Sequence, residues 1–158
     1  MIRITRFMRA ASSSPFSAIV AVPSVATLRH LAGRVDTLVV GGAMAFTLLR
    51  AMGHGTGRSL VEESMIDEAR GIIDAVEATS TTLLLPVDFV CASAPSDGVD
   101  TTVAGRDIDD GLMGLDIGPA AIDAFGAAIR DARTVGWNGP RGMCEIPPFE
   151  RVTLAVAK

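Results

Sequence analysis

The sequence has 158 residues, a length that suits one domain with a single buried core. Hydrophobic residues make up 49% of it and charged residues 20%, which excludes a disordered polyelectrolyte and predicts a globular chain. The formal net charge of -4 gives no general basic field for nucleic acid or an anionic membrane, so we expect a small-molecule partner.

No apolar run approaches the roughly 20 residues needed to cross a bilayer, so we expect no membrane span. We interpret residues 1–158 as one domain. The first 14 residues are rich in arginine and serine and contain no acidic residue, a composition typical of an organellar transit peptide. Ile2, Ile4 and Phe7 also fit an amphipathic helix, so residues 1–13 can equally be interpreted as the remnant of a helix between two domains.

The cysteine and histidine content predicts no metal cluster. Cys91 and Cys144 lie far apart without CxxC spacing, and His30 and His54 are the chain's only histidines. This composition suits a reducing cytoplasm in which each cysteine is a small buried apolar group, although spacing alone leaves a disulfide open.

Apolar runs alternate with helical patterns along the first part of the chain. Ser17–Val22 predicts a buried strand, and Ser24–Gly33 predicts a short helix. Thr37–Val40 predicts a second buried strand, which leads into a diglycine turn and an apolar helix over 43–52. Glu62–Thr79 carries the strongest helical pattern, because its apolar residues recur at helical spacing and its acidic residues occupy the other faces.

The second part of the chain continues the alternation. Thr81–Val90 predicts a strand that Pro86 weakens, and the polar residues 92–111 predict a surface excursion. Met113–Pro119 predicts a glycine-containing turn that opens a helix, and Thr134–Asn138 predicts a further strand. Near-continuous apolar strands alternating with helices favour an α/β fold, a Rossmann-like three-layer sandwich with a mainly parallel sheet.

Three segments lie where ligands bind in such sheets, beyond the carboxyl ends of strands. Gly41 and Gly42, within residues 41–44, have no side chain, so a base or ribose could approach the backbone there. A tight turn that binds no ligand explains the two glycines equally well. Residues 113–119 lead to a helix N-terminus that attracts phosphate or needs only a cap. In residues 137–145, Asn138 could donate to a phosphoryl oxygen and Glu145 could accept from sugar hydroxyls.

Five segments in this order resemble the C-terminal, nucleotide-binding domain of the phosphoglycerate kinase family. They are VDTLVVGGAMAFTLL, GRSLVEESMIDEA, LLLPVDFVCA, GLMGLDIGPAAIDAF and ARTVGWNGPRGMCEIPPF, and the resemblance covers nearly all of 14–158. It implies ATP or ADP as ligand, Mg²⁺ on the nucleotide phosphates, and phosphoryl transfer between 3-phosphoglycerate and 1,3-bisphosphoglycerate in glycolysis.

The resemblance also assigns site residues by position. Gly41 and Gly42 resemble the family's glycines beside the adenine, and Gly114 resembles a glycine that contacts the nucleotide. Glu145 resembles the carboxylate that holds the ribose, and Asn138 resembles the asparagine near the transferred phosphate. We assign no catalytic residue and no metal ligand.

The sequence departs from the family pattern on the phosphate side. The family usually has lysines in a GGAKVSDK segment, whereas this chain has Ala21–Leu28 there, without lysine and a few residues shorter. Cys144 stands where the family commonly has phenylalanine. The sequence ends before the family's GGGD segment, whose aspartate serves magnesium, and lacks the N-terminal domain that binds 3-phosphoglycerate. We therefore expect an incomplete Mg²⁺ site. We also expect no binding of the acceptor, 3-phosphoglycerate, unless the N-terminal domain is supplied.

These departures leave three hypotheses. The first is the family function, with this chain as part of a kinase and inactive when alone. The second is a non-catalytic module that binds adenine nucleotide or a protein partner, and the third is a decaying fragment. A Rossmann oxidoreductase is disfavoured because the GxGxxG fingerprint is missing.

Overall fold

A computed structural model of the chain describes residues 17–19, 25–96 and 98–136. The elements follow one another as β1 (Ser17–Ile19), α1 (Val25–Leu31), β2 (Thr37–Val39), α2 (Ala43–Ala51), the 3₁₀ helix η1 (Glu63–Met65), α3 (Ile66–Glu77), β3 (Thr82–Leu84), β4 (Phe89–Ala92), β5 (Thr102–Ala104), β6 (Met113–Ile117) and α4 (Pro119–Asp131).

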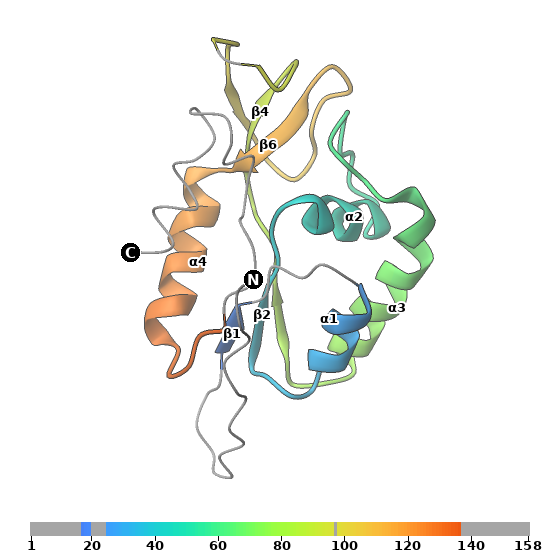
Figure 1. Ribbon diagram of the computed structural model, residues 1–158, viewed down its shortest axis with the longest axis vertical. Coiled ribbons are helices and arrows are strands. Elements are labelled where there is room, and N and C mark those ends of the chain that lie inside the picture. Colours follow the sequence, from blue (N-terminus) through green and yellow to red (C-terminus); the bar gives the residue numbers. More distant parts are fainter. Residues whose placement is uncertain (1–16, 20–24, 97, 137–158) are drawn as a thin grey trace, which may run out of the picture.

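The strands β1, β2 and β3 form a parallel sheet in that order. Helices α1, α2 and α3 lie on one side of it, and α4 lies on the other (Figure 1). Leu38 and Val39 of the central strand are buried, as expected for a strand covered on both faces. The predicted Rossmann-like α/β fold with a parallel sheet is confirmed.

A second sheet, which is antiparallel, was not predicted. Its strand order is β5-β4-β6, and it lies at one end of the molecule, at the top of Figure 1. The prediction of one strand over Thr81–Val90 is therefore wrong, because β3 belongs to the parallel sheet and β4 to the antiparallel one. Pro86 lies in the break, where its missing N–H cannot join a ladder. Its carbonyl oxygen instead accepts a hydrogen bond from Arg106 Nε at 3.2 Å.

Three further strand and turn predictions change in the structure. Met113–Pro119 is not a turn, because Met113–Ile117 forms strand β6 and pairs with β4. The expected surface excursion over 92–111 contains strand β5. Residues 134–136 lie outside any strand, and the remainder of the strand predicted over Thr134–Asn138 lies outside the described residues.

The four predicted helices are confirmed, and α3 shows why the pattern was informative. Ala69, Ile72 and Val76 are buried, while the acidic side chains on the other faces are exposed. Asp67 and Glu68 lie in its first turn, where their negative charge interacts favourably with the positive end of the helix dipole. None of the helices in the described ranges is long and apolar enough to cross a membrane.

One apolar cluster connects both sheets and α4. It includes Leu38 from the parallel sheet, Phe89 and Ile117 from the antiparallel sheet, and Phe125 from α4. Burying each such side chain stabilises the fold by about 1.5–3 kcal/mol. The rings of Phe46 and Phe89 lie 4.7 Å apart between centroids, so α2 packs directly against the antiparallel sheet.

Candidate functional site

Gly41 and Gly42 occupy the turn between the carboxyl end of β2 and the first turn of α2. Gly41 is buried. Gly42 has a φ of 65°, a backbone conformation that residues with a Cβ rarely adopt. A Cβ placed on Gly42 would meet no atom of the described residues within 4 Å. Among the described residues, therefore, nothing fills the space beside the Gly42 backbone, as a ligand that approaches the main chain requires.

The N-terminus of α2 also lacks a side-chain cap in the part of the chain that the structure describes. Gly42 is the N-cap residue and provides no capping atom, and the first turn contains no acidic residue. The first N–H groups of a helix have no partner within the helix and carry partial positive charge. The Ala45 N–H already donates to the Gly42 carbonyl oxygen at 3.0 Å, so the donors that this end of α2 offers to a polar or anionic ligand are those of Ala43 and Met44.

The N-terminus of α4 is closed, in contrast. Asp88 lies just before β4, and its carboxylate accepts hydrogen bonds from the backbone N–H groups of Ala120 at 3.0 Å and Ala121 at 2.7 Å. Of the two explanations that the sequence left open for residues 113–119, helix capping is the one that the structure supports. Asp88 was missed in the sequence because it lies 32 residues before Ala120.

Gly114 lies in strand β6, and its surroundings explain why glycine is needed there. A Cβ on Gly114 would lie 2.5 Å from Cζ of Phe46, closer than real contacts allow. The Gly114 N–H donates to Ser59 Oγ at 2.9 Å. Phe46 lies one turn after Gly42 on α2, so the ring places Gly114 beside the first two turns of that helix.

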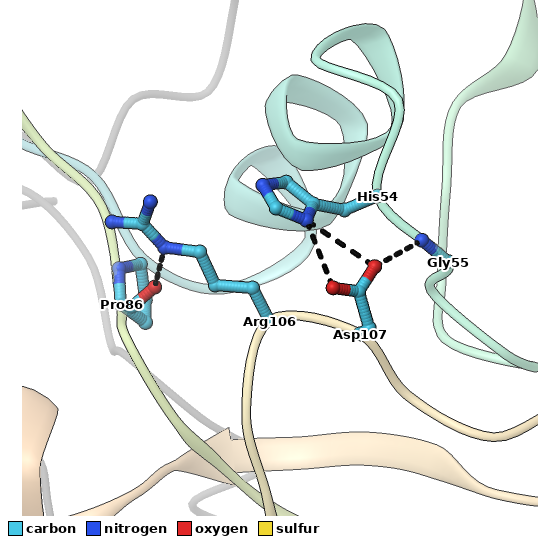
Figure 2. Close-up of polar contacts among 5 residues, drawn as sticks. All are labelled: His54, Gly55, Pro86, Arg106 and Asp107. Atoms are coloured by element: carbon cyan, nitrogen blue, oxygen red, sulfur yellow. Dashed lines mark hydrogen bonds and ion pairs between the residues drawn. The ribbon is translucent and has the colours of Figure 1, made fainter.

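The segment His54–Ser59, which we call the strap, fastens the end of α2 to the region before β6 (Figure 2). Asp107 Oδ1 accepts from the Gly55 N–H at 2.9 Å, and His54 Nδ1 lies 3.2 and 3.3 Å from the two carboxylate oxygens. Because an ionised carboxylate can only accept, Nδ1 carries the hydrogen. The Gly55 N–H and then His54 lower the pKa of Asp107 below its ordinary value of 3.8.

The C-terminal end of the strap, at Arg58 and Ser59, bonds to residues at the beginning of β6. The Arg58 N–H donates to the Leu112 carbonyl oxygen at 2.7 Å, and Ser59 accepts from Gly114. Strand β6 is therefore held at its beginning by Arg58 and Ser59 of the strap.

The profile of the phosphoglycerate kinase family matches residues 4–158. The chain belongs to this family. A phosphoglycerate kinase from Anaeromyxobacter dehalogenans is 46% identical over 149 residues, in a match that covers 91% of this chain and 38% of the relative. One from Thermus thermophilus is 47% identical over 135 residues, 85% of this chain and 35% of the relative.

Solved structures agree with this assignment. The structure of phosphoglycerate kinase from Coxiella burnetii matches with a TM-score of 0.86 and 33% identity, over 93% of this chain and 39% of that one. Phosphoglycerate kinase from Pyrococcus horikoshii has the same fold, with a TM-score of 0.73 at 21% identity. The chain spans less than two fifths of the length of the curated relatives named above.

The five site residues expected from the phosphoglycerate kinase resemblance are only partly placed. Gly41 and Gly42 lie at the N-terminus of α2, and Gly114 lies beside Phe46 of the same helix. Asn138 and Glu145 lie outside the described residues, so their positions stay predictions. Within the described ranges, no three His, Cys, Asp or Glu side chains gather as a metal site.

A separate cavity of about 280 Å³ lies between α3 and β3. Its lining residues are Met52, Ile73, Val76, Glu77, Thr79, Thr81, Leu83, Leu85 and Arg106. None of the family's expected nucleotide residues is among them, so this cavity is distinct from the turn at Gly42.

Proposed function

We propose that this chain forms the base and ribose side of an adenine-nucleotide site in an enzyme that transfers a phosphoryl group between ATP and 3-phosphoglycerate. The observation that carries the proposal is the N-terminus of α2 directly beyond the carboxyl end of β2, where no described residue lies within 4 Å of a Cβ added to Gly42. Membership of the phosphoglycerate kinase family supports the identity of the nucleotide.

In this proposal the diglycine turn lets the flat adenine approach the main chain, because neither Gly41 nor Gly42 projects a side chain. Gly114 would line the site from β6, as the family resemblance implies, with its N–H held by Ser59 Oγ. Glu145 would hold the ribose hydroxyls, and Asn138 would contact a phosphoryl oxygen.

In this proposal the chain provides fewer binding contacts to the nucleotide phosphates than to the base and ribose. The chain's single lysine is Lys158, and Ser24 and its neighbours stand where the family usually has lysines. Magnesium would enter on the nucleotide phosphates, where it neutralises charge, and we assign none of the described residues to it. We propose that 3-phosphoglycerate binds to the family's N-terminal domain. A cytoplasmic location suits this function and the free thiol of buried Cys91.

A pair of alanine variants at the two ends of α2 tests the proposal. Gly42→Ala introduces a Cβ at the proposed site, and Gly53→Ala is its control at the other end of the helix. Both positions have positive φ, 65° and 94°, with no described atom within 4 Å of an added Cβ. Gly53→Ala should destabilise the fold by about 1–2 kcal/mol through backbone strain. Gly42→Ala should cost about 1–3 kcal/mol, because its φ of 65° and ψ of -157° lie in a region that glycine almost alone adopts.

Only Gly42→Ala should weaken ADP binding, by roughly tenfold, because a displaced donor or a blocked base contact is worth about 1.4 kcal/mol. Isothermal calorimetry of both variants, at a temperature where each is folded, gives the two dissociation constants. Equal ADP affinity in the two variants would reject the site at α2.

A further inference from the structure

Asp88 lies where the chain passes from the parallel sheet to the antiparallel one, and it holds the junction of β6 and α4. Its main-chain carbonyl oxygen accepts from the Gly118 N–H at 2.8 Å. Its two carboxylate oxygens accept from Ala120 and Ala121, as described above. One residue thus bonds three backbone N–H groups that immediately follow β6.

The carboxylate also occupies the space that a side chain at position 118 would need. A Cβ on Gly118 would lie 2.3 to 2.6 Å from three atoms of the Asp88 carboxylate group. Asp88 and Gly118 are therefore sterically matched, and a change at either one disturbs the same junction.

The register between β4 and β6 makes this junction matter for Gly114. Phe89, the neighbour of Asp88, pairs with Ile117, but the ladder shifts between Val90 and Cys91 before Cys91 pairs with Gly114. Because the ladder is disrupted at this shift, the pairing of Phe89 with Ile117 does not by itself set the position of Gly114. Asp88 anchors the carboxyl end of β6, and the strap anchors its beginning through Ser59.

We propose that Asp88 is a positioning residue: by fixing the end of β6, it sets Gly114 against Phe46 and so shapes the wall beside the N-terminus of α2. The inference rests on the proposed nucleotide function for its effect on affinity. Its effect on Gly114 itself does not depend on any ligand.

The first test is an NMR comparison of the ligand-free chain and its D88A and D88N variants. The Gly114 amide resonance reports its bond to Ser59, so D88A should shift it and raise its hydrogen-exchange rate by roughly tenfold. The side-chain amide introduced by D88N retains one oxygen that can accept an N–H, so this variant should restore part of the protection. G126A is the control, since its Cβ in α4 would meet the movable end of Arg130.

The second test is a double-mutant cycle on Asp88 and Gly118. G118A should lower the urea midpoint strongly in the native chain, where the Cβ meets the carboxylate, and much less in the D88A background. Additive losses would overturn the steric pairing, and an unchanged Gly114 amide in D88A would overturn the positioning role.

Measuring the affinity for ADP then tests the positioning role of Asp88 separately from the proposed nucleotide binding. D88A should bind ADP about threefold or more weakly than the native chain, while G126A binds it equally well. If D88A were merely less stable, the ADP affinity of its folded form would equal that of the native chain, and the positioning role would be rejected. If the native chain bound no ADP, the proposed function would fail, and the Gly114 amide would still decide the positioning role.

Discussion

At Gly114 one absent methyl group decides how β6 packs on α2. Gly114→Ala would push a Cβ against the Phe46 ring, which lies 2.5 Å from that position at Cζ. Overpacking of this kind costs about 1–3 kcal/mol, so the free energy of unfolding measured in urea should fall by that amount. Phe46→Leu in the same chain should recover part of the loss, because the shorter side chain leaves room for the Cβ.

Gly111→Ala is the matched control for this change. Gly111 is exposed and has no described atom within 4 Å of an added Cβ, so its stability should change by less than about 0.5 kcal/mol. A Gly114→Ala chain as stable as this control would mean that the close contact with Phe46 does not exist in solution.

At the scale of elements, the strap joins α2 to the region before β6 through a carboxylate that depends on pH. The pKa of Asp107 is lowered in the folded chain, so its contribution to stability is present above the ordinary value of 3.8 and is lost as pH falls through the lower folded value. Asp107→Asn should therefore lower the urea midpoint near neutral pH, and the difference from the native chain should shrink as the pH falls below 3.8 through the lower folded pKa of Asp107.

Asp110→Asn serves as the control for the strap, because the exposed Asp110 side chain makes no hydrogen bond or ion pair with a described residue and is only a few residues away. Its urea midpoint should follow that of the native chain at every pH. A difference between Asp107→Asn and the native chain that stays constant to the lowest pH at which both chains are folded would show that the ionised carboxylate does not fasten the strap.

Elements with a local signal were predictable from the sequence, and those set by distant contacts were not. The helix α3 follows from the spacing of Ile72 and Val76, a pattern complete within its own residues. The glycines of residues 113–119 were interpreted as turn residues, whereas Gly114 lies in a strand that pairs with β4, and Phe46 fills the space of its missing side chain. Pro86 signalled a weak strand, but only pairing with β5 and β6 assigns β4 to a second sheet.

The candidate site also contains residues that local sequence features located and residues that only distant contacts reveal. The diglycine turn was located from the sequence because a strand end and a helix start are both local features. Asp88 and Ser59 were missed, since each bonds a backbone group more than 30 residues away and no short motif marks such a pair.

At the scale of the whole molecule, the family was recognised from five segments in order, and the family profile and curated relatives confirm it. The order of motifs along the chain carries this information even where individual glycines are ambiguous. The roles of Asn138 and Glu145 stay predictions, because both lie outside the described residues.

The most direct measurement is an NMR titration of the chain with adenosine and with ATP, each with and without magnesium. We expect both ligands to shift the amide resonances of Gly41, Gly42 and Ala43 and to bind with nearly equal affinity, on the order of millimolar or about 4 kcal/mol. Magnesium should add little, because the sequence segment around Ser24 contains no lysine to bind the phosphates. Much tighter, magnesium-dependent binding of ATP, or shifts confined to the cavity between α3 and β3, would contradict the account.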